Sequence, residues 1–252
     1  MSKITSSVLI IGNEILSGRT QEINVKFIAM ELSKIGISLN EVRVVPDINK
    51  QIIFALNELR KKYDYVLTTG GIGPTHDDIT SECVSKALKT KYEINQEAYH
   101  LLKEYYPEGH LNEGRVKMTK MPKGSKLIKN IVTVAPGFYI KNIFVLPGVP
   151  KIMQVMFKEV IKKLKKTKPI ISITINTNLY ESIMAKDLDI IQNAHMECEI
   201  GSYPHFDFNR RSASVNVVVS GKKRKIIILV KKKIITAVKK LGGKAREISS
   251  ER

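Results

Sequence analysis

The sequence predicts an α/β protein in which a three-layer, mostly parallel sheet domain is followed by a smaller α+β domain. Short apolar runs alternate with helical patterns through the first half of the chain, and such alternation is typical of a parallel sheet with helices on both faces. The pattern changes after the polar segment Lys165-Lys166-Thr167-Lys168-Pro169. With 252 residues, the chain has room for one medium domain and one small one.

Three apolar segments in the first half have the length and composition of buried strands. They cover residues 8–11, 39–45 and 65–69. A helix is expected after each of them, because apolar residues recur there at three- and four-residue spacing. The positions that carry this spacing are Val25, Ile28, Ala29, Leu32 and Ile35 in the first helix, Ile52, Ala55, Leu56 and Leu59 in the second, and Val84, Ala87 and Leu88 in the third.

The middle of the chain is less regular. Residues 97–126 combine helical stretches with breaks at proline and glycine. Two short apolar runs, residues 138–140 and 143–146, flank Lys141-Asn142, which predicts a hairpin with a two-residue turn. Pro150 then suits the first turn of a helix that is expected to extend to about residue 166.

The domain boundary is placed after residue 167, which gives a sheet domain over residues 1–167 and a small domain over residues 168–252. Alternating apolar residues in the small domain predict strands, and helical spacing predicts two helices. The expected strands cover residues 171–175, 199–203 and 214–219, and the expected helices cover residues 181–192 and 227–241. This order is typical of a two-layer α+β domain.

The chain carries a large positive charge, because 42 lysines and arginines face 24 aspartates and glutamates, for a formal net charge of +18. Such a surplus can attract nucleic acid or anionic small molecules. A lysine-rich, solvated surface is the favoured interpretation, since the sequence lacks the arginine forks and interleaved aromatics of a base-reading surface. Nucleic-acid binding through Lys222-Lys223-Arg224-Lys225 and Lys231-Lys232-Lys233 is the less favoured alternative.

Cysteine usage and hydropathy narrow the class of protein further. Cys83 and Cys198 lie far apart and belong to no Cys-x-x-Cys pattern, so neither a disulfide scaffold nor a zinc site is expected. Each is predicted to be a small buried residue. No apolar run approaches the roughly 20 residues that a membrane span requires. We therefore expect a cytoplasmic protein without membrane contact.

Three loops are expected at one edge of the sheet, where parallel strands end and where the ligands of such sheets bind. They are residues 12–18, the pair Pro46-Asp47, and residues 70–78. The glycines of the third loop lack a Cβ, so its backbone can adopt positive φ and bring N–H groups close to a ligand. Together with the start of the following helix, this loop suits a phosphate or another anion.

Two adjacent carboxylates, Asp77 and Asp78, are the sharper indication of function. Carboxylates beside a phosphate-binding loop indicate a cation between them, and oxygen ligands favour Mg²⁺ or a similar hard metal. Asp47, at the neighbouring strand end, could join such a site, in which the metal polarises phosphoryl oxygens. The structural alternatives are that one of the two aspartates caps the following helix and that Glu14 is a solvated loop carboxylate.

These loops resemble motifs of a known family. The likeness is to the N-terminal part of the competence/damage-inducible protein CinA family, within the molybdopterin-binding MoaB/Mog superfamily, and residues 11–18, 69–80, 135–138 and 146–150 carry it. Residues 200–206 are similar to the matching region of the molybdopterin-binding part of eukaryotic FAD synthase. The resemblance covers nearly the whole chain.

The resemblance implies a MoaB/Mog-type sheet domain, a KH-like α+β domain after it, and a homo-oligomer. In the wider superfamily the loop that matches residues 70–78 binds molybdopterin or its adenylated form, and aspartates that match Asp47 and Asp78 act in adenylyl transfer or metal binding. In the CinA and FAD-synthase branches the domain is associated with metal-dependent cleavage of pyrophosphates such as ADP-ribose or FAD.

The sequence also departs from these relatives. It matches neither the deamidase domain of long CinA proteins nor the adenylyl-transferase domain of FAD synthase, so neither reaction is expected of it. Residues 112–118 differ from the glutamine-alanine pattern of long CinA proteins. In this segment Arg115 and Lys117 are candidates for neutralising a substrate phosphate, and surface salt bridges are the equal alternative.

The favoured hypothesis is a metal-dependent nucleotide pyrophosphatase that acts on an ADP-containing metabolite, and the alternative is a non-catalytic molybdopterin- or nucleotide-binding module. Glu14 is the candidate base, and Asp47 and Asp78 are further catalytic candidates. Asp47, Asp77 and Asp78 are the candidate ligands of Mg²⁺, Mn²⁺ or Co²⁺, and a monovalent cation is a further candidate. The candidate ligand-binding residues are Gly12, Ser17, Gly18, Gly70, Gly71, Gly73, Pro74, Thr75, Thr80 and Gly148.

Overall fold

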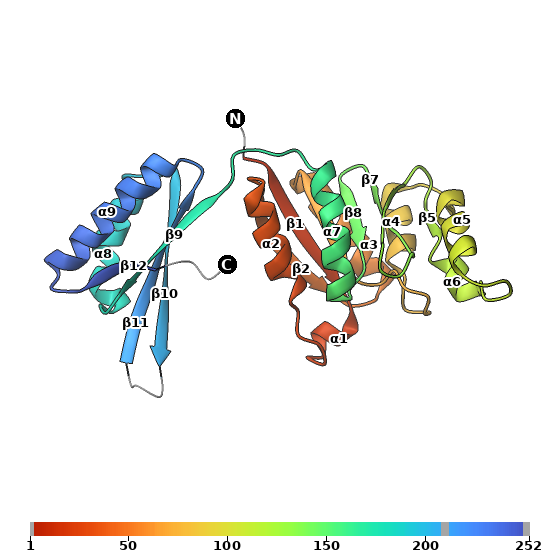
Figure 1. Ribbon diagram of the computed structural model, residues 1–252, viewed down its shortest axis with the longest axis horizontal. Coiled ribbons are helices and arrows are strands. Elements are labelled where there is room, and N and C mark those ends of the chain that lie inside the picture. The colour runs from red at the N-terminus through yellow and green to blue at the C-terminus, as the bar shows by residue number, and fades with distance from the viewer. Residues whose placement is uncertain (1–2, 208–211, 249–252) are drawn as a thin grey trace. The chain divides into compact units, whose positions relative to one another are not determined.

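A computed structural model of the chain describes residues 3–207 and 212–248. The chain folds as two compact units, Met1–Lys166 and Thr167–Arg252, both of which can be followed in Figure 1. Each unit has its own sheet and its own core of buried apolar side chains.

In the described part of the first unit, strands and helices alternate as predicted. The strands are β1 (Thr5–Ile11), β2 (Ser38–Val45), β3 (Tyr65–Thr69), β4 (Tyr92–Ile94), β5 (Lys120–Pro122), β6 (Lys126–Ile128), β7 (Gly137–Ile140) and β8 (Ile143–Leu146). The helices are α1 (Asn13–Leu16), α2 (Asn24–Lys34), α3 (Asn49–Lys62), α4 (Thr80–Leu88), α5 (Gln96–Tyr105), α6 (Glu113–Lys117) and α7 (Pro150–Lys163). The prediction missed α1, β4, β5 and β6, because elements of three or four residues are too short to show a periodicity.

Six strands of the described first unit form one sheet in the order β2-β1-β3-β8-β7-β6. The β1/β2, β1/β3 and β3/β8 pairs are parallel, and the β8/β7 and β7/β6 pairs are antiparallel. The predicted hairpin at Lys141-Asn142 is confirmed by the β7/β8 pairing. Because β2 and β3 lie on opposite sides of β1, the strand order reverses between β1 and β3. Such a switch point opens a crevice at the carboxyl ends of the strands.

The sheet separates two layers of core. Side chains alternate along a strand, so Leu9 and Ile11 face one layer while Val8 and Ile10 face the other. Residues of α3 and α4 fill the first layer, and residues of α2 and α7 fill the second. Figure 1 shows α2 and α7 in front of this sheet. The predicted three-layer, mostly parallel architecture is therefore confirmed.

The second unit is a two-layer α+β structure, as predicted. Its elements are β9 (Ile171–Thr177), α8 (Glu181–Asn193), β10 (Cys198–Asp207), β11 (Ser212–Gly221), α9 (Arg224–Lys240) and β12 (Ala245–Ile248). The strands form an antiparallel sheet in the order β10-β11-β9-β12, and α8 and α9 pack against its apolar face. The last strand, β12, was not predicted. Across both units, Cys83 and Cys198 are free and buried, as expected.

Among the helices within residues 3–207 and 212–248, none has the length and apolar character that crossing a membrane requires.

One backbone contact fixes how β3 leaves the sheet. Gly70 follows β3 with a φ of +100°, and its N–H donates to the carbonyl oxygen of Leu146 at 3.1 Å. A Cβ built on Gly70 would lie 2.1 Å from the carbonyl oxygen of Ile11, at the end of β1. Only glycine satisfies both the conformation and the approach, so this residue sets the spacing of the crevice between β1 and β3.

Substituting Gly70 should therefore destabilise the first unit more than positive φ alone accounts for. Gly124 has a φ of +83° but nothing within 4 Å of its built Cβ, so Gly124→Ala isolates the conformational cost, about 1–2 kcal/mol. We expect Gly70→Ala to lower the free energy of unfolding by clearly more, because the methyl group also displaces the β1 backbone. Urea unfolding of both variants measures the difference, and equal losses would contradict the account.

A charged cluster holds the edge strand β2 to α3. The carboxylate of Glu41 accepts hydrogen bonds from Lys62 Nζ at 2.9 Å, Tyr63 Oη at 2.8 Å and Arg43 Nη2 at 2.6 Å. These donors, with Lys62 the largest contributor, lower the pKa of Glu41 to about 2. Arg43 also pairs with Glu58 on α3 at 2.5 Å.

This cluster predicts a defined acid sensitivity. The pKa of Glu41 is lower in the folded chain than its ordinary value of 4.5, so the folded state binds the proton more weakly than the unfolded state. The stabilisation is present above about pH 4.5 and is lost as the pH falls toward about 2. Glu41→Gln should remove this part of the pH dependence in urea unfolding, whereas Glu108→Gln, in an exposed loop, should retain it. An unchanged pH profile in Glu41→Gln would refute the role.

Candidate functional site at the carboxyl ends of β1, β3 and β8

Three of the predicted glycines meet at the carboxyl end of the sheet. Gly12 follows β1, Gly70 follows β3 and Gly148 lies just beyond β8. The Gly12 N–H donates to Val45 O at 3.2 Å, which carries the β1/β2 pairing past the end of β1. A Cβ on Gly148 would lie 3.4 Å from the Cα of Gly70, so these two backbones pass close to each other. The structure thus brings the predicted loops together at one edge.

The glycine turn after β3 is held from below by Thr80. Gly70 and Gly71 both have positive φ, +100° and +67°. The buried Thr80 hydroxyl donates to Gly70 O at 2.9 Å, and the Thr80 N–H donates to Gly71 O at 3.0 Å. Thr80 therefore positions the turn from inside the protein. Within the described residues, the N–H groups of Gly71, Ile72 and Gly73 donate to no other group, so they are available to a ligand.

The next segment of the loop gathers the predicted carboxylates around one hydroxyl. Thr75 Oγ1 lies 2.6 Å from Asp77 Oδ1 and 2.5 Å from Asp78 Oδ2, and the Thr75 N–H donates to Asp78 Oδ2 at 2.8 Å. The Thr75 hydroxyl holds the pKa of Asp77 below its usual value. A hydroxyl has a single hydrogen and can donate to only one of the two oxygens. The arrangement therefore suits a cation beside the pair.

The alternative interpretation, in which Asp77 or Asp78 caps the helix α4, is wrong. The residue at the N-cap of α4 is Ile79, and no side chain caps that helix. Asp78 instead closes the turn at Thr75, because it accepts the Thr75 N–H while its own N–H donates to Thr75 O at 3.2 Å. A Cβ on Gly73 would lie 2.7 Å from Asp78 Oδ2, so Gly73 leaves room for this carboxylate.

Asp47 contacts the start of α1 and not the loop that carries Asp77 and Asp78. Its Oδ2 accepts the N–H of Asn13 at 2.9 Å and so holds the start of α1. Among the residues that the structure describes, no group of three or more histidine, cysteine, aspartate or glutamate side chains is arranged to hold a metal ion. Asp47 is thus not gathered with Asp77 and Asp78 into one preformed ligand set. A magnesium site completed by substrate oxygens and water does not require such a set.

Glu14 lies over the end of β1. Its carboxylate folds back so far that a Cβ on Gly12 would lie 2.4 Å from Glu14 Oε1. Ser17 and Gly18 form the turn after α1, where the Ser17 hydroxyl donates to the Glu14 carbonyl oxygen at 3.3 Å and Gly18 has a φ of +71°. The two residues therefore shape the loop that presents Glu14.

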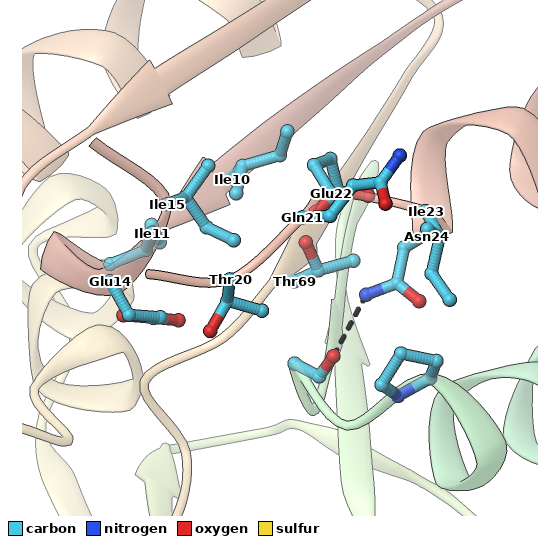
Figure 2. A pocket seen from close by; sticks show the side chains of 12 residues that line it. Ile10, Ile11, Glu14, Ile15, Thr20, Gln21, Glu22, Ile23, Asn24 and Thr69 are labelled. Carbon is cyan, nitrogen blue, oxygen red and sulfur yellow. Dashed lines mark hydrogen bonds between the residues drawn. The ribbon is translucent and has the colours of Figure 1, made fainter. Parts of the chain in front are cut away.

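A narrow cleft of about 40 Å³ opens beside Glu14 and is lined by residues of the loop before α2, by Thr69 and by Gly148. Figure 2 shows Glu14 and Thr20 toward one end of this cleft and Asn24 toward the other. The Asn24 Nδ2 donates to Gly148 O at 2.8 Å. Glu14, Gly148 and the loop that begins at Thr69 were predicted from the sequence, whereas Thr20 and Asn24 were not, because single polar residues beside apolar runs carry no spacing pattern.

A second, wider groove borders the acidic part of the loop, and its lining includes Pro74, Thr75, His76, Lys117 and Lys120. The Lys117 ammonium donates to the Thr75 carbonyl oxygen. Arg115, by contrast, stacks 3.9 Å above the Tyr106 ring and donates to His110 O. Of the two basic candidates in this segment, Lys117 contacts the acidic part of the loop. Arg115 instead contacts Tyr106 and His110, which lie in its own segment of the chain.

Comparison with known proteins identifies both parts of the chain. Residues 7–166 match the family model for the probable molybdopterin binding domain, and residues 169–242 match that for the FAD synthase middle domain. A protein of Sulfolobus acidocaldarius is 32% identical over 260 residues, which cover 96% of this chain and 98% of that protein. A protein of Caldivirga maquilingensis is 41% identical over 164 residues, which cover 63% of this chain and 64% of that protein.

A solved structure agrees with these matches. The crystal structure of the protein CinA of unknown function from Thermoplasma acidophilum is 35% identical, with a TM-score of 0.61, over 64% of this chain and 99% of that chain. The resemblance inferred from the loops is confirmed. The chain belongs to the family of probable molybdopterin binding domains, with a MoaB/Mog-type α/β fold, and carries a C-terminal α+β region similar to the FAD synthase middle domain.

Proposed function

We propose that this chain is a divalent-metal-dependent nucleotide pyrophosphatase that cleaves the phosphoanhydride of an ADP-containing metabolite such as ADP-ribose or FAD. The observation that carries the proposal is the composition of one loop at the switch point of the sheet. That loop combines N–H groups available at Gly71, Ile72 and Gly73 with the Asp77 and Asp78 carboxylates. Beside it, Glu14 lines a cleft.

The glycine turn suits one phosphate of the substrate. Backbone N–H groups in a turn of positive φ form a concave anion site, and Gly70 and Gly71 have that conformation. Lys117 at the neighbouring groove adds positive charge, because its ammonium lies at the Thr75 carbonyl. A pyrophosphate that spans the turn and the groove would be neutralised at both ends.

Asp77 and Asp78 are the residues that would hold Mg²⁺, Mn²⁺ or Co²⁺, with Asp47 as a further ligand and a monovalent cation as a further component. The crowding of two carboxylates on the single hydrogen of Thr75 supports a cation at this place. When bound, such an ion withdraws charge from phosphoryl oxygens. The proposal also includes that the chain assembles into a homo-oligomer.

Glu14 is proposed to act as the general base. Its carboxylate borders the cleft and accepts a proton from water as the water oxygen forms a bond to phosphorus. The bridging P–O bond breaks, and the leaving phosphate takes up a proton from solvent. Cleavage of ADP-ribose then gives AMP and ribose 5-phosphate, and cleavage of FAD gives AMP and FMN.

A non-catalytic molybdopterin- or nucleotide-binding module is the second candidate. It is favoured by the fact that Asp47 and Asp78 each already accept a backbone N–H, from Asn13 and Thr75. Both carboxylates would then maintain the loops of a binding site. This function predicts ligand binding without turnover under any divalent metal.

Product release from ADP-ribose, FAD, NAD and dinucleoside polyphosphates separates the two functions. We expect AMP to form only when Mg²⁺, Mn²⁺ or Co²⁺ is present, and the rates would rank the substrates. Chromatography of the reaction mixtures detects AMP directly. A folded protein that binds AMP but releases none from these substrates would contradict the pyrophosphatase proposal and support a binding module.

Substitutions test the roles proposed for Asp78 and Glu14. Asp78→Asn should abolish turnover and keep the fold, because an amide oxygen can still accept the Thr75 N–H. The matched control is Asp189→Asn in the second unit, whose carboxylate is exposed and whose loss should leave turnover unchanged. Glu14→Gln should lower kcat by about 10²- to 10⁴-fold, the usual contribution of a general base. Turnover retained in Asp78→Asn would overturn the assignment.

A further inference from the structure

The outer strand of the second unit, β10, has backbone groups that no neighbouring strand satisfies. In the sheet order β10-β11-β9-β12, β10 has a strand on one side only. The Ile200 N–H donates to Gln192 Oε1 at 2.7 Å and therefore points away from β11. Both backbone groups of a residue in an antiparallel pair point to the same side, and that side alternates along the strand. The N–H and C=O of Ser202 thus face the free edge as well, as does the C=O of Pro204.

Both ends of this free edge are closed, and one short segment between them is open. Gln192 covers the beginning, because its amide nitrogen also donates to Cys198 O at 2.9 Å. Pro204 has no N–H and so cannot donate to an added strand. Between these two closures, the Ser202 N–H donates to no group within the described residues 3–207 and 212–248. A segment centred on Ser202 can therefore still pair with another chain.

A groove of about 520 Å³, the α8/β10 groove, lies between this open segment and α8. Residues of α8 from Glu181 to Gln192 line one wall, and Ile200 and Ser202 of β10 line the other. At 1.5 Å per residue this stretch of helix is roughly 16 Å long, which is about the length of five residues of extended chain. The groove therefore has the length of a short peptide strand.

The α8/β10 groove is acidic, although the chain as a whole has a formal net charge of +18. Its charged lining residues are Glu181 and Asp189, and no lysine or arginine lines it. The ion pairs described in the second unit involve other carboxylates. Leu188 and Ile200 provide apolar surface beside the two acidic residues. Such a surface suits a lysine or arginine, whose aliphatic stem packs on apolar groups while its cationic head stays in water.

We propose that the α8/β10 groove binds an extended segment of a partner protein, which adds to β10 as a fifth, antiparallel strand and presents a lysine or arginine. The partner residue opposite Ser202 exchanges both backbone hydrogen bonds with it, and its side chain lies on the same face of the sheet as the Ser202 side chain, toward α8. This residue is the basic one, with its head group beside Glu181 and Asp189. The inference goes beyond the proposed function and does not rest on it.

Fluorescence anisotropy with the full chain tests the inference. The probe is the peptide Thr-Val-Lys-Val-Thr with fluorescein at its N-terminus and an amide at its C-terminus. Two matched peptides carry glutamate in place of lysine, or a methyl group on the backbone nitrogen of the lysine. We expect each change to weaken binding about tenfold or more, because the first reverses the charge beside two carboxylates and the second removes the N–H that pairs with the Ser202 carbonyl. Equal affinity for the three peptides, or no binding of the lysine peptide at about 1 mM, would overturn the inference.

Substitutions in the groove locate the bound peptide. Glu181→Gln and Asp189→Asn should each weaken binding of the lysine peptide about two- to fivefold, the usual effect of an exposed ion pair. Asp187→Asn, on α8 but outside the groove lining, should leave the affinity unchanged. Full affinity in a variant with both groove substitutions, or an equal loss in Asp187→Asn, would place the peptide elsewhere and overturn the inference. None of these substitutions should alter AMP release, so the failure of this inference and that of the proposed function are observed separately.

Discussion

The close approach of Gly70 to the Ile11 carbonyl oxygen is the constraint on which the site depends. Because β1 and β3 are adjacent and parallel, the loops that follow them must diverge within one or two residues. The chain achieves this with positive φ at Gly70 and Gly71 and with the buried Thr80 hydroxyl beneath the turn. The same turn passes close to Gly148, so the ends of β1, β3 and β8 form one rim.

The side chains on this rim divide into two groups. One group, Asp47, Thr80 and Asp78, forms hydrogen bonds with backbone groups of the loops themselves. These three side chains were predicted to be functional, and in the structure they maintain the loop conformations. Glu14 and Asn24 instead line the cleft beside the rim. The proposed phosphate site therefore rests on the available N–H groups of the glycine turn.

The fold could be predicted because periodicity is a property of long, half-buried elements. The alternation of Val8, Leu9, Ile10 and Ile11 between two core layers is visible in the sequence. The strands β4, β5 and β12 are too short or too polar to show it. For the site, glycines and paired aspartates marked the loop, but the place of Asn24 could not be found, since its hydrogen bond to Gly148 joins residues that lie 124 positions apart in sequence. The helix-capping interpretation of the aspartates failed because Thr75 competes for Asp78.

A crystal structure of the chain with AMP and Mg²⁺ would test the central claim most directly, which is that the glycine turn binds a phosphate and that Asp77 and Asp78 hold a metal ion beside it. The account predicts the phosphate at the N–H groups of residues 71–73 and Mg²⁺ beside the carboxylates of Asp77 and Asp78. AMP bound in the groove beside Lys120, or on the second unit, with the glycine turn in contact with solvent only, would contradict it.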